Sequence, residues 1–170
     1  MILNLVILAF VTLERLGELW LSNRNTRRLV AQGAQEAGAG HYPVMIAIHV
    51  LWLAALWWLA PWRQVDGFWL AAFVLLELAR IWVVATLGQR WTTRIIVLPE
   101  APLVRAGPYR WVDHPNYMVV VGEIAVLPLI FGLWQVALLF SLLNAAILAV
   151  RIREENRALR PQGSLARPLP

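Results

Sequence analysis

The sequence predicts an all-α integral membrane protein with about five transmembrane helices, of which the last two form a helical hairpin. The chain of 170 residues is 60% hydrophobic and only 15% charged, whereas about 25% of residues are charged in a typical soluble domain. A chain of this length has too little interior to hide so much apolar surface. Its apolar residues also gather in runs that are long enough to cross a bilayer.

Three separate apolar runs predict the first three helices. They cover residues 1–21, 42–60 and 67–87, and each is close to the 20 or so residues that a spanning helix needs. Because no internal repeat or linker divides the chain, we expect one transmembrane domain over residues 1–160. Residues 161–170 are rich in Pro, Gly and Ser, which predicts a disordered C-terminal tail.

The fourth apolar run predicts the hairpin. Residues 117–150 are apolar almost throughout and too long for one span. Pro128 and Gly132 are residues that break helices and favour turns. We therefore expect two shorter helices joined by a turn at residues 131–133.

The arginines predict the orientation. The chain has no lysine, and twelve of its fifteen arginines fall in segments that the five-helix topology places on one side. By the positive-inside rule the N-terminus lies outside and the C-terminus in the cytoplasm. The basic charge then reflects topology and anionic lipid rather than nucleic acid. Abundant Ala, Leu and Arg without Lys suits a GC-rich bacterium, which suggests a bacterial inner membrane.

Several ionisable residues interrupt the predicted helices. They are Glu14, Arg15, Glu18, Glu77, Arg80 and Glu123, with His49 in the second helix. Such residues face the bundle interior or water, so they either form a polar cavity or tie the helices together. Glu77 and Arg80 are spaced to pair along one helix. For Glu14 and Glu18 a structural or interfacial role is favoured, and His49 is interpreted as a hydrogen-bonded structural residue.

The segment at residues 98–117, LPEAPLVRAGPYRWVDHPNY, is too polar to span the membrane and contains four prolines. Prolines fix the backbone without forming a helix, which leaves backbone N–H and C=O groups available to a ligand. Tyr109, Trp111 and Tyr117 offer aromatic faces, and His114 offers an imidazole. The combination suits a nucleoside-like ligand at the cytoplasmic surface, although a loop with turn prolines is the alternative interpretation.

A second polar motif, RIREE, follows the last helix. Arg151 and Glu155 are spaced i,i+4 and therefore share one helix face. Alone, the motif describes a snorkelling arginine at a charged helix end. The short hairpin, however, returns it to the same membrane surface as the proline-rich segment.

GPYRWVDHPNY followed after a hairpin by RIREEN resembles the isoprenylcysteine carboxyl methyltransferase family, whose members are integral membrane enzymes that use S-adenosylmethionine. The resemblance covers roughly residues 87–159. The stretch ERLGELWLSNRNTRRLVAQGAQEAGAGHYP is similar to a bacterial branch that is associated with methylating alkylpyrones or phenolic lipids. One departure is Asp113, which stands where the family usually has a basic residue before His-Pro.

The resemblance implies specific site residues. It implies cofactor contacts at Ala101, Pro102, Leu103, Val104, Tyr109, His114, Pro115, Asn116, Tyr117 and Glu155. It implies that Arg151 meets the acceptor group, where a guanidinium suits a planar oxyanion. For a hydroxyl acceptor, His114 or a glutamate is the expected base. Asp113 leaves this cofactor motif intact but changes the charge beside His114.

The predicted reaction is therefore transfer of a methyl group from S-adenosylmethionine to a carboxylate or an enol or phenol hydroxyl of a lipophilic acceptor. The expected partners are that acceptor and membrane lipids, without nucleic acid and without a metal. The chain has no cysteine, so it cannot form a thiolate metal site. Two alternatives stay open: an NADPH-dependent membrane reductase of the sterol type, which shares a similar His-Pro-x-Tyr segment, and a non-enzymatic membrane scaffold.

Overall fold

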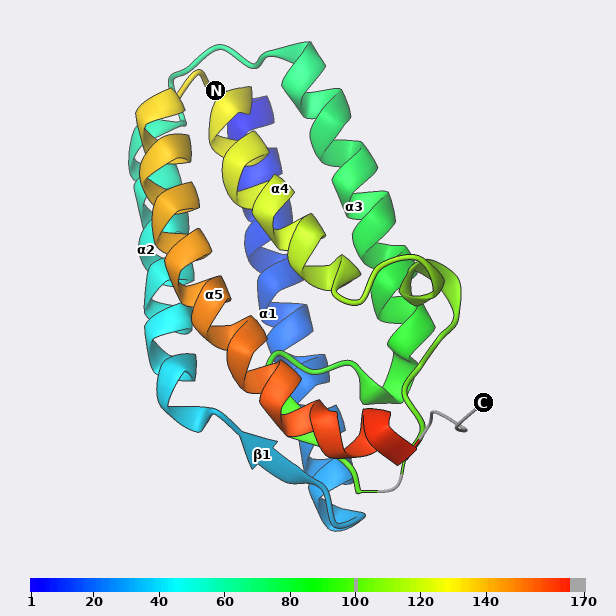
Figure 1. Ribbon diagram of the computed structural model, residues 1–170. Helices are drawn as coiled ribbons and strands as arrows, with labels where there is room; N and C mark the ends of the chain where they lie inside the picture. Colours follow the sequence, from blue (N-terminus) through cyan, green and yellow to red (C-terminus); the bar gives the residue numbers. More distant parts are fainter. Residues whose placement is uncertain (100, 166–170) are drawn as a thin grey trace.

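Five long helices run side by side along a common axis (Figure 1). The computed structural model describes residues 1–99 and 101–165, with only the backbone described for residues 160–165. The helices confirm the predicted fold class, including the hairpin. In chain order the elements are α1 (Ile2–Ala31), β1 (Gln35–Ala37), η1 (Ala39–His41), α2 (Tyr42–Leu59), α3 (Gly67–Leu87), η2 (Gly88–Arg90), β2 (Ile95–Val97), η3 (Gly107–Arg110), α4 (Pro115–Ile130) and α5 (Trp134–Leu165).

Local sequence signals account for where the helices begin and end. Asp66 caps α3, because its carboxylate accepts hydrogen bonds from the backbone N–H groups of Phe68 (2.9 Å) and Trp69 (3.3 Å). Pro115 occupies the first position of α4, where its missing N–H costs nothing. Gly132, with φ of 66°, makes the turn between α4 and α5. The predicted turn at residues 131–133 is confirmed.

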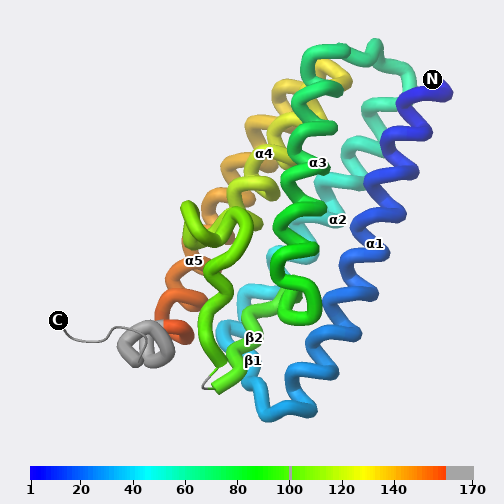
Figure 2. The backbone as a smooth tube through the Cα atoms, turned by 90° about the vertical axis from the view of Figure 1, so that its right-hand side faces the viewer, coloured from blue at the N-terminus to red at the C-terminus, as the bar shows by residue number. Residues whose placement is uncertain are grey.

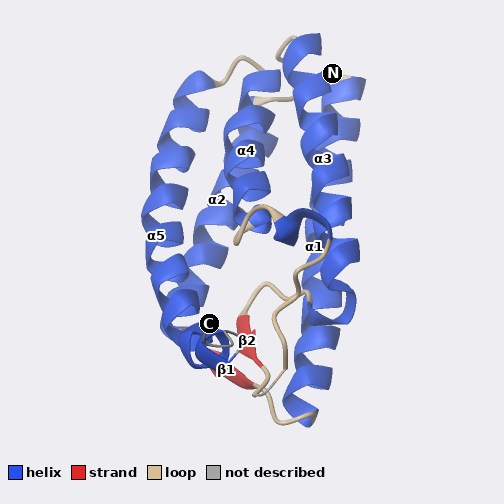
Figure 3. Cartoon of the chain, turned by 45° about the vertical axis from the view of Figure 1, so that its right-hand side comes forward, coloured by secondary structure: helices blue, strands red, loops and turns tan. Residues whose placement is uncertain are grey.

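Three helical ranges have the length and composition of membrane spans: Ala39–Leu59, Gly67–Arg90 and Trp134–Leu159. α4 is apolar but has only 16 residues, which gives about 24 Å of helix against a hydrocarbon core of about 30 Å. α1 is long enough but carries charged residues along its length. α4 therefore stops short of its neighbours at one end of the bundle (Figures 1 and 3).

The two ends of the bundle differ. At the end that holds the N-terminus, an apolar core is formed by side chains including Leu8, Leu56, Leu127 and Ile130. The opposite end holds the β1–β2 ribbon, the irregular segment before α4 and the C-terminal part of α5 (Figure 2). The segments that carry most of the arginines also come together at this second end (Figure 1), which we call the arginine-rich end. The space left by the short α4 lies there too.

An ionic cluster ties three helices together between these ends. Arg80 on α3 donates to Glu123 on α4 (Nε to Oε1, 2.6 Å) and to Glu18 on α1 (2.8 Å). Arg15 pairs with Glu18 (2.9 Å) and reaches Glu123 (3.2 Å). No ion pair joins Glu77 to Arg80 among the described residues. The partners of Arg80 lie on other helices, so the cluster has a cross-linking role that the sequence spacing left open.

The β1–β2 ribbon is a feature that the sequence did not predict. Gln35–Ala37 pairs antiparallel with Ile95–Val97. Polar contacts from α1 fix the chain before β2: Ser22 Oγ accepts from the Thr93 N–H (2.8 Å), and Asn25 donates to the Trp91 carbonyl (2.8 Å). The ribbon therefore covers the arginine-rich end as a defined element.

The expected C-terminal tail falls mostly on residues whose side chains are not described. α5 continues to Leu165 and so includes the first five residues of the tail that the composition predicts. Residues 166–170 lie outside the described residues. The boundary between the domain and its tail stays a prediction.

Candidate functional site

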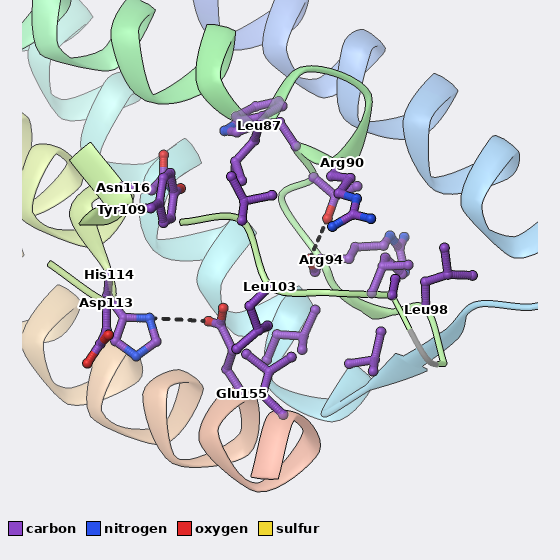
Figure 4. Close-up of a pocket in the computed structure, with 18 of the residues that line it drawn as sticks. Leu87, Arg90, Arg94, Leu98, Leu103, Tyr109, Asp113, His114, Asn116 and Glu155 are labelled. Atoms are coloured by element: carbon purple, nitrogen blue, oxygen red, sulfur yellow. Dashed lines mark hydrogen bonds and ion pairs between the residues drawn. The ribbon is translucent and has the colours of Figure 1, made fainter. Parts of the chain in front are cut away.

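A cavity of about 630 Å³ opens at the arginine-rich end, and we call it the outer cavity. Its walls come from the 98–114 segment, β2, the start of α4 and the C-terminal part of α5 (Figure 4). Ten of the eleven predicted site residues line it: Ala101, Pro102, Leu103, Val104, Tyr109, His114, Asn116, Tyr117, Arg151 and Glu155. The other one, Pro115, is buried at the start of α4 and is not part of the lining.

The two sequence motifs meet at the hydroxyl group of Tyr117. This hydroxyl donates to the carboxylate of Glu155 and accepts from Arg151 Nε at 2.8 Å. The Arg151 side chain is buried, and its guanidinium lies 5.4 Å from the centre of the Tyr117 ring. Arg151 and Glu155 thus share one face of α5, as their spacing predicts, and both are held by one side chain of α4.

His114 is fixed on the other side of the same group. Its ring stacks on Tyr117 with 5.1 Å between ring centres and an angle of 20°. Its Nε2 lies 3.2 Å from Asn156 Oδ1, and its Nδ1 lies 3.9 Å from Glu155 (Figure 4). An imidazole, a phenol, a carboxylate and a guanidinium therefore face one cavity within a short stretch of two helices.

The segment that closes the outer cavity is held at two points. Arg90 donates to the Pro102 carbonyl at 2.6 Å. Gly107 has φ of 51°, and a Cβ there would lie only 2.5 Å from Thr86 Oγ1, so the close approach to α3 requires glycine. Within this segment, burial raises the pKa of Tyr109, and the negative charge of Glu155 adds to the effect. Tyr109 therefore presents a neutral phenol to the cavity.

Asp113, the departure from the family pattern, is exposed at the rim of the outer cavity. No ion pair to Asp113 is present in the described part of the chain. Glu154 pairs with Arg157 at 3.0 Å.

A second, smaller cavity of about 210 Å³ lies among the five α-helices, with Arg15, Glu18 and Arg80 of the ionic cluster in its lining, and we call it the inner cavity. Its wall is mostly apolar, with Leu16, Ile46 and Leu148 among its side chains. Four residues line both cavities: Trp91, Asn116, Tyr117 and Arg151. The Arg151–Tyr117 pair therefore stands where a larger cavity with many polar groups meets a smaller, mostly apolar one.

Sequence reasoning missed several residues at these cavities. Arg94 lines the outer cavity, pairs with Glu36 of β1 (2.9 Å) and lies over the Tyr42 ring at 4.4 Å. Asn156, which holds His114, directly follows the RIREE motif and could have been suspected from its position. The inner cavity had no signal in the sequence, because its lining residues come from all five α-helices and from the segment before β2.

Comparisons with known proteins identify the family of the chain. The model of the isoprenylcysteine carboxyl methyltransferase family matches residues 69–161. Uncharacterized protein YpbQ of Bacillus subtilis is 38% identical over 160 residues, which cover 91% of this chain and 95% of that protein. An uncharacterized protein of Haemophilus influenzae is 28% identical over 151 residues, covering 85% of this chain and 88% of its own. No solved structure matches the chain.

The family match begins within α3. It includes the 98–114 segment, the α4–α5 hairpin, and the hydrogen-bonded residues Tyr117, Arg151 and Glu155. The match to YpbQ covers 91% of the chain, so the similarity also includes α2 and at least part of α1, which lie before the family match. On this evidence the chain belongs to the isoprenylcysteine carboxyl methyltransferase family, a family of membrane methyltransferases.

Proposed function

We propose that this protein transfers a methyl group from S-adenosylmethionine in the outer cavity to an oxygen of a lipophilic acceptor in the inner cavity. The observation that carries the proposal is the position of Arg151 and Tyr117, which line both cavities and are joined by a hydrogen bond. A two-substrate reaction needs a place where both reactants meet.

The outer cavity fits the chemistry of the cofactor. Its volume of about 630 Å³ lies within the range of about 300–1,000 Å³ that is usual for cofactor sites. Glu155 offers a carboxylate to hydroxyl or ammonium groups. Asn116 Oδ1 is buried without a hydrogen-bond partner in the described structure, as expected of an acceptor that a ligand satisfies. When bound, S-adenosylmethionine supplies an electrophilic methyl group on a positively charged sulfur.

Arg151 is the residue we assign to the acceptor oxygen. Tyr117 holds its Nε, and its Nη1 lies 3.5 Å from Met45 Sδ. Its Nη2 has no hydrogen-bond partner among the described residues, so the guanidinium can still bind an oxyanion. Because its own geometry is fixed before the acceptor arrives, Arg151 would orient the oxygen without reorganisation.

The acceptor class decides whether a base is needed. A carboxylate reacts without proton removal, whereas an enol or phenol hydroxyl has to lose its proton. His114 and Glu155 lie at the outer cavity near Tyr117 and are the residues we assign to that step. Isoprenylcysteine-like acids, alkylpyrones and phenolic lipids remain the acceptor classes under this proposal.

We assign the protein to a bacterial inner membrane, with the N-terminus outside and the outer cavity in the cytoplasm. Twelve of its fifteen arginines belong to segments at the arginine-rich end, and the positive-inside rule places that end in the cytoplasm. The orientation would give the cavity access to soluble cytoplasmic cofactor, while acceptors enter from the bilayer.

Ligand-induced stabilisation of the detergent-solubilised protein tests the proposal. S-adenosylhomocysteine should raise the melting temperature and NADPH should not, because only a ligand that binds the folded state stabilises it. Stabilisation by NADPH alone would instead support a membrane reductase. Lipid extracts from the source organism, incubated with methyl-labelled cofactor, should then yield labelled lipids by mass spectrometry, and Arg151→Ala should abolish the label while retaining S-adenosylhomocysteine binding.

A further inference from the structure

The inner cavity contains polar groups that have no hydrogen-bond partner among the described residues. Asn144 on α5 is only 3% exposed and lines the cavity, yet its amide has no hydrogen-bond partner among the described residues. Trp52 on α2 also lines the cavity, and its Nε1 is buried without a partner. Unpaired polar groups are costly in a dry interior, and each one calls for an explanation such as a bound ligand or water.

His49 on α2 adds a hydrogen-bond acceptor to the same wall. Its Nδ1 lies 2.8 Å from the Met45 carbonyl, which can only accept, so Nδ1 carries the proton. In the neutral ring Nε2 then bears a lone pair. His49 lines the inner cavity, and no side chain in the described structure donates to this nitrogen.

These groups lie deeper in the bundle than Arg151. Met45 contacts Arg151, and His49 follows Met45 by four residues, which is about 6 Å along the helix. Asn144 precedes Arg151 by seven residues on α5, and Trp52 follows Met45 by seven on α2, which is about 10 Å in each case. The polar groups therefore form a level about one to two helical turns below the Arg151–Tyr117 pair.

We infer that the acceptor carries a second oxygen, a hydroxyl group, which binds between His49 and Asn144 while Arg151 holds the oxygen to be methylated. This inference rests on the proposed function. A hydroxyl can donate to His49 Nε2 and accept from the Asn144 amide at once. A purely hydrocarbon tail would leave both groups unpaired, so the cavity selects an acceptor with two separated oxygens over one with a single polar end.

A pair of phenols that differ by one hydroxyl tests the inference. The probes are 4-propylphenol and 4-(3-hydroxypropyl)phenol. Each is titrated into the detergent-solubilised full chain by calorimetry, and equilibrium dialysis gives the free concentration of each phenol outside the detergent micelles. We expect the wild type to bind the diol about tenfold more tightly, although the monophenol is more apolar. The near-isosteric Asn144→Leu and His49→Leu variants should each lose most of this preference.

The controls separate the possible failures. Leu143→Ala, beside Asn144 but outside the cavity lining, should keep the wild-type preference. Equal affinity for both phenols in the wild type, as expected if the polar level holds water only, would overturn the inference, and so would an unchanged preference in Asn144→Leu. S-adenosylhomocysteine titrated into the same samples tests the proposed function on its own, since its binding does not involve the inner polar level.

Discussion

Tyr117→Phe removes one oxygen atom at the centre of the candidate site. The hydroxyl links buried Arg151 to Glu155 through two hydrogen bonds. Hydrogen bonds to charged groups contribute about 1.5–3 kcal/mol each. Without the hydroxyl, Arg151 and Glu155 can partly pair with each other directly. We therefore count the free energy of one hydrogen bond, not of two, as the loss. Because each 1.36 kcal/mol changes a rate tenfold, methyl transfer should fall by about 10-fold to 100-fold.

The same variant should affect cofactor binding less. The phenyl ring still packs beside His114, so S-adenosylhomocysteine should bind no more than about tenfold more weakly, the loss of one ordinary hydrogen bond. Transfer is measured as labelled methyl in lipid extract, and affinity by calorimetry. Tyr42→Phe is the matched control, because Tyr42 lines neither cavity and loses one hydroxyl that is hydrogen-bonded to Thr93 at 2.9 Å. Unchanged transfer in Tyr117→Phe would refute the role of Tyr117 in positioning Arg151.

Three further predictions concern charge, backbone and the acceptor contact. Arg80→Met should lower the free energy of unfolding by about 1–3 kcal/mol, because buried Glu123 loses the nearer of its two arginines and keeps only Arg15 at 3.2 Å. Adding Glu123→Leu should restore part of that loss in a detergent melt; no restoration would contradict the pairing. Gly107→Ala should destabilise the fold by about 1–3 kcal/mol, whereas Gly17→Ala, which meets nothing within 4 Å, should not. Arg151→Lys should keep S-adenosylhomocysteine affinity within about threefold but lose transfer about 100-fold, since an ammonium cannot make the forked contact; wild-type transfer in that variant would remove the assignment.

Local signals in the sequence predicted the number of helices and the hairpin, although α1 continues to Ala31 and α5 to Leu165, beyond the apolar runs that end at residues 21 and 150. Pro128 and Gly132 act within a few residues of the turn that they predict, and the turn is confirmed at residues 131–133. The β1–β2 ribbon depends instead on segments about 60 residues apart. Each of its strands has three residues, which is too short to show an alternating pattern.

The charged residues show the same limit. Sequence spacing identifies neighbours on one helix, so it pointed from Arg80 to Glu77. The structure gives Arg80 partners on α1 and α4, and only the packing of three helices determines that choice. The candidate outer site could be predicted from the sequence because each of its two motifs is a contiguous stretch. Ten of the eleven predicted residues line one cavity.

The two cavities therefore differ in which parts of the chain supply their lining residues. The outer cavity is built largely from residues 98–117 and α5, which fall inside the family match over residues 69–161. His49 and Trp52 lie before that match, on α2, and only Asn144 of the inner polar level lies within it. Under the proposed function, the cofactor site would lie within the family match, whereas His49 and Trp52 of α2 would help to select the acceptor from outside it. Exchanging α2 residues that line the inner cavity should change which lipid is methylated and leave S-adenosylhomocysteine affinity unaltered.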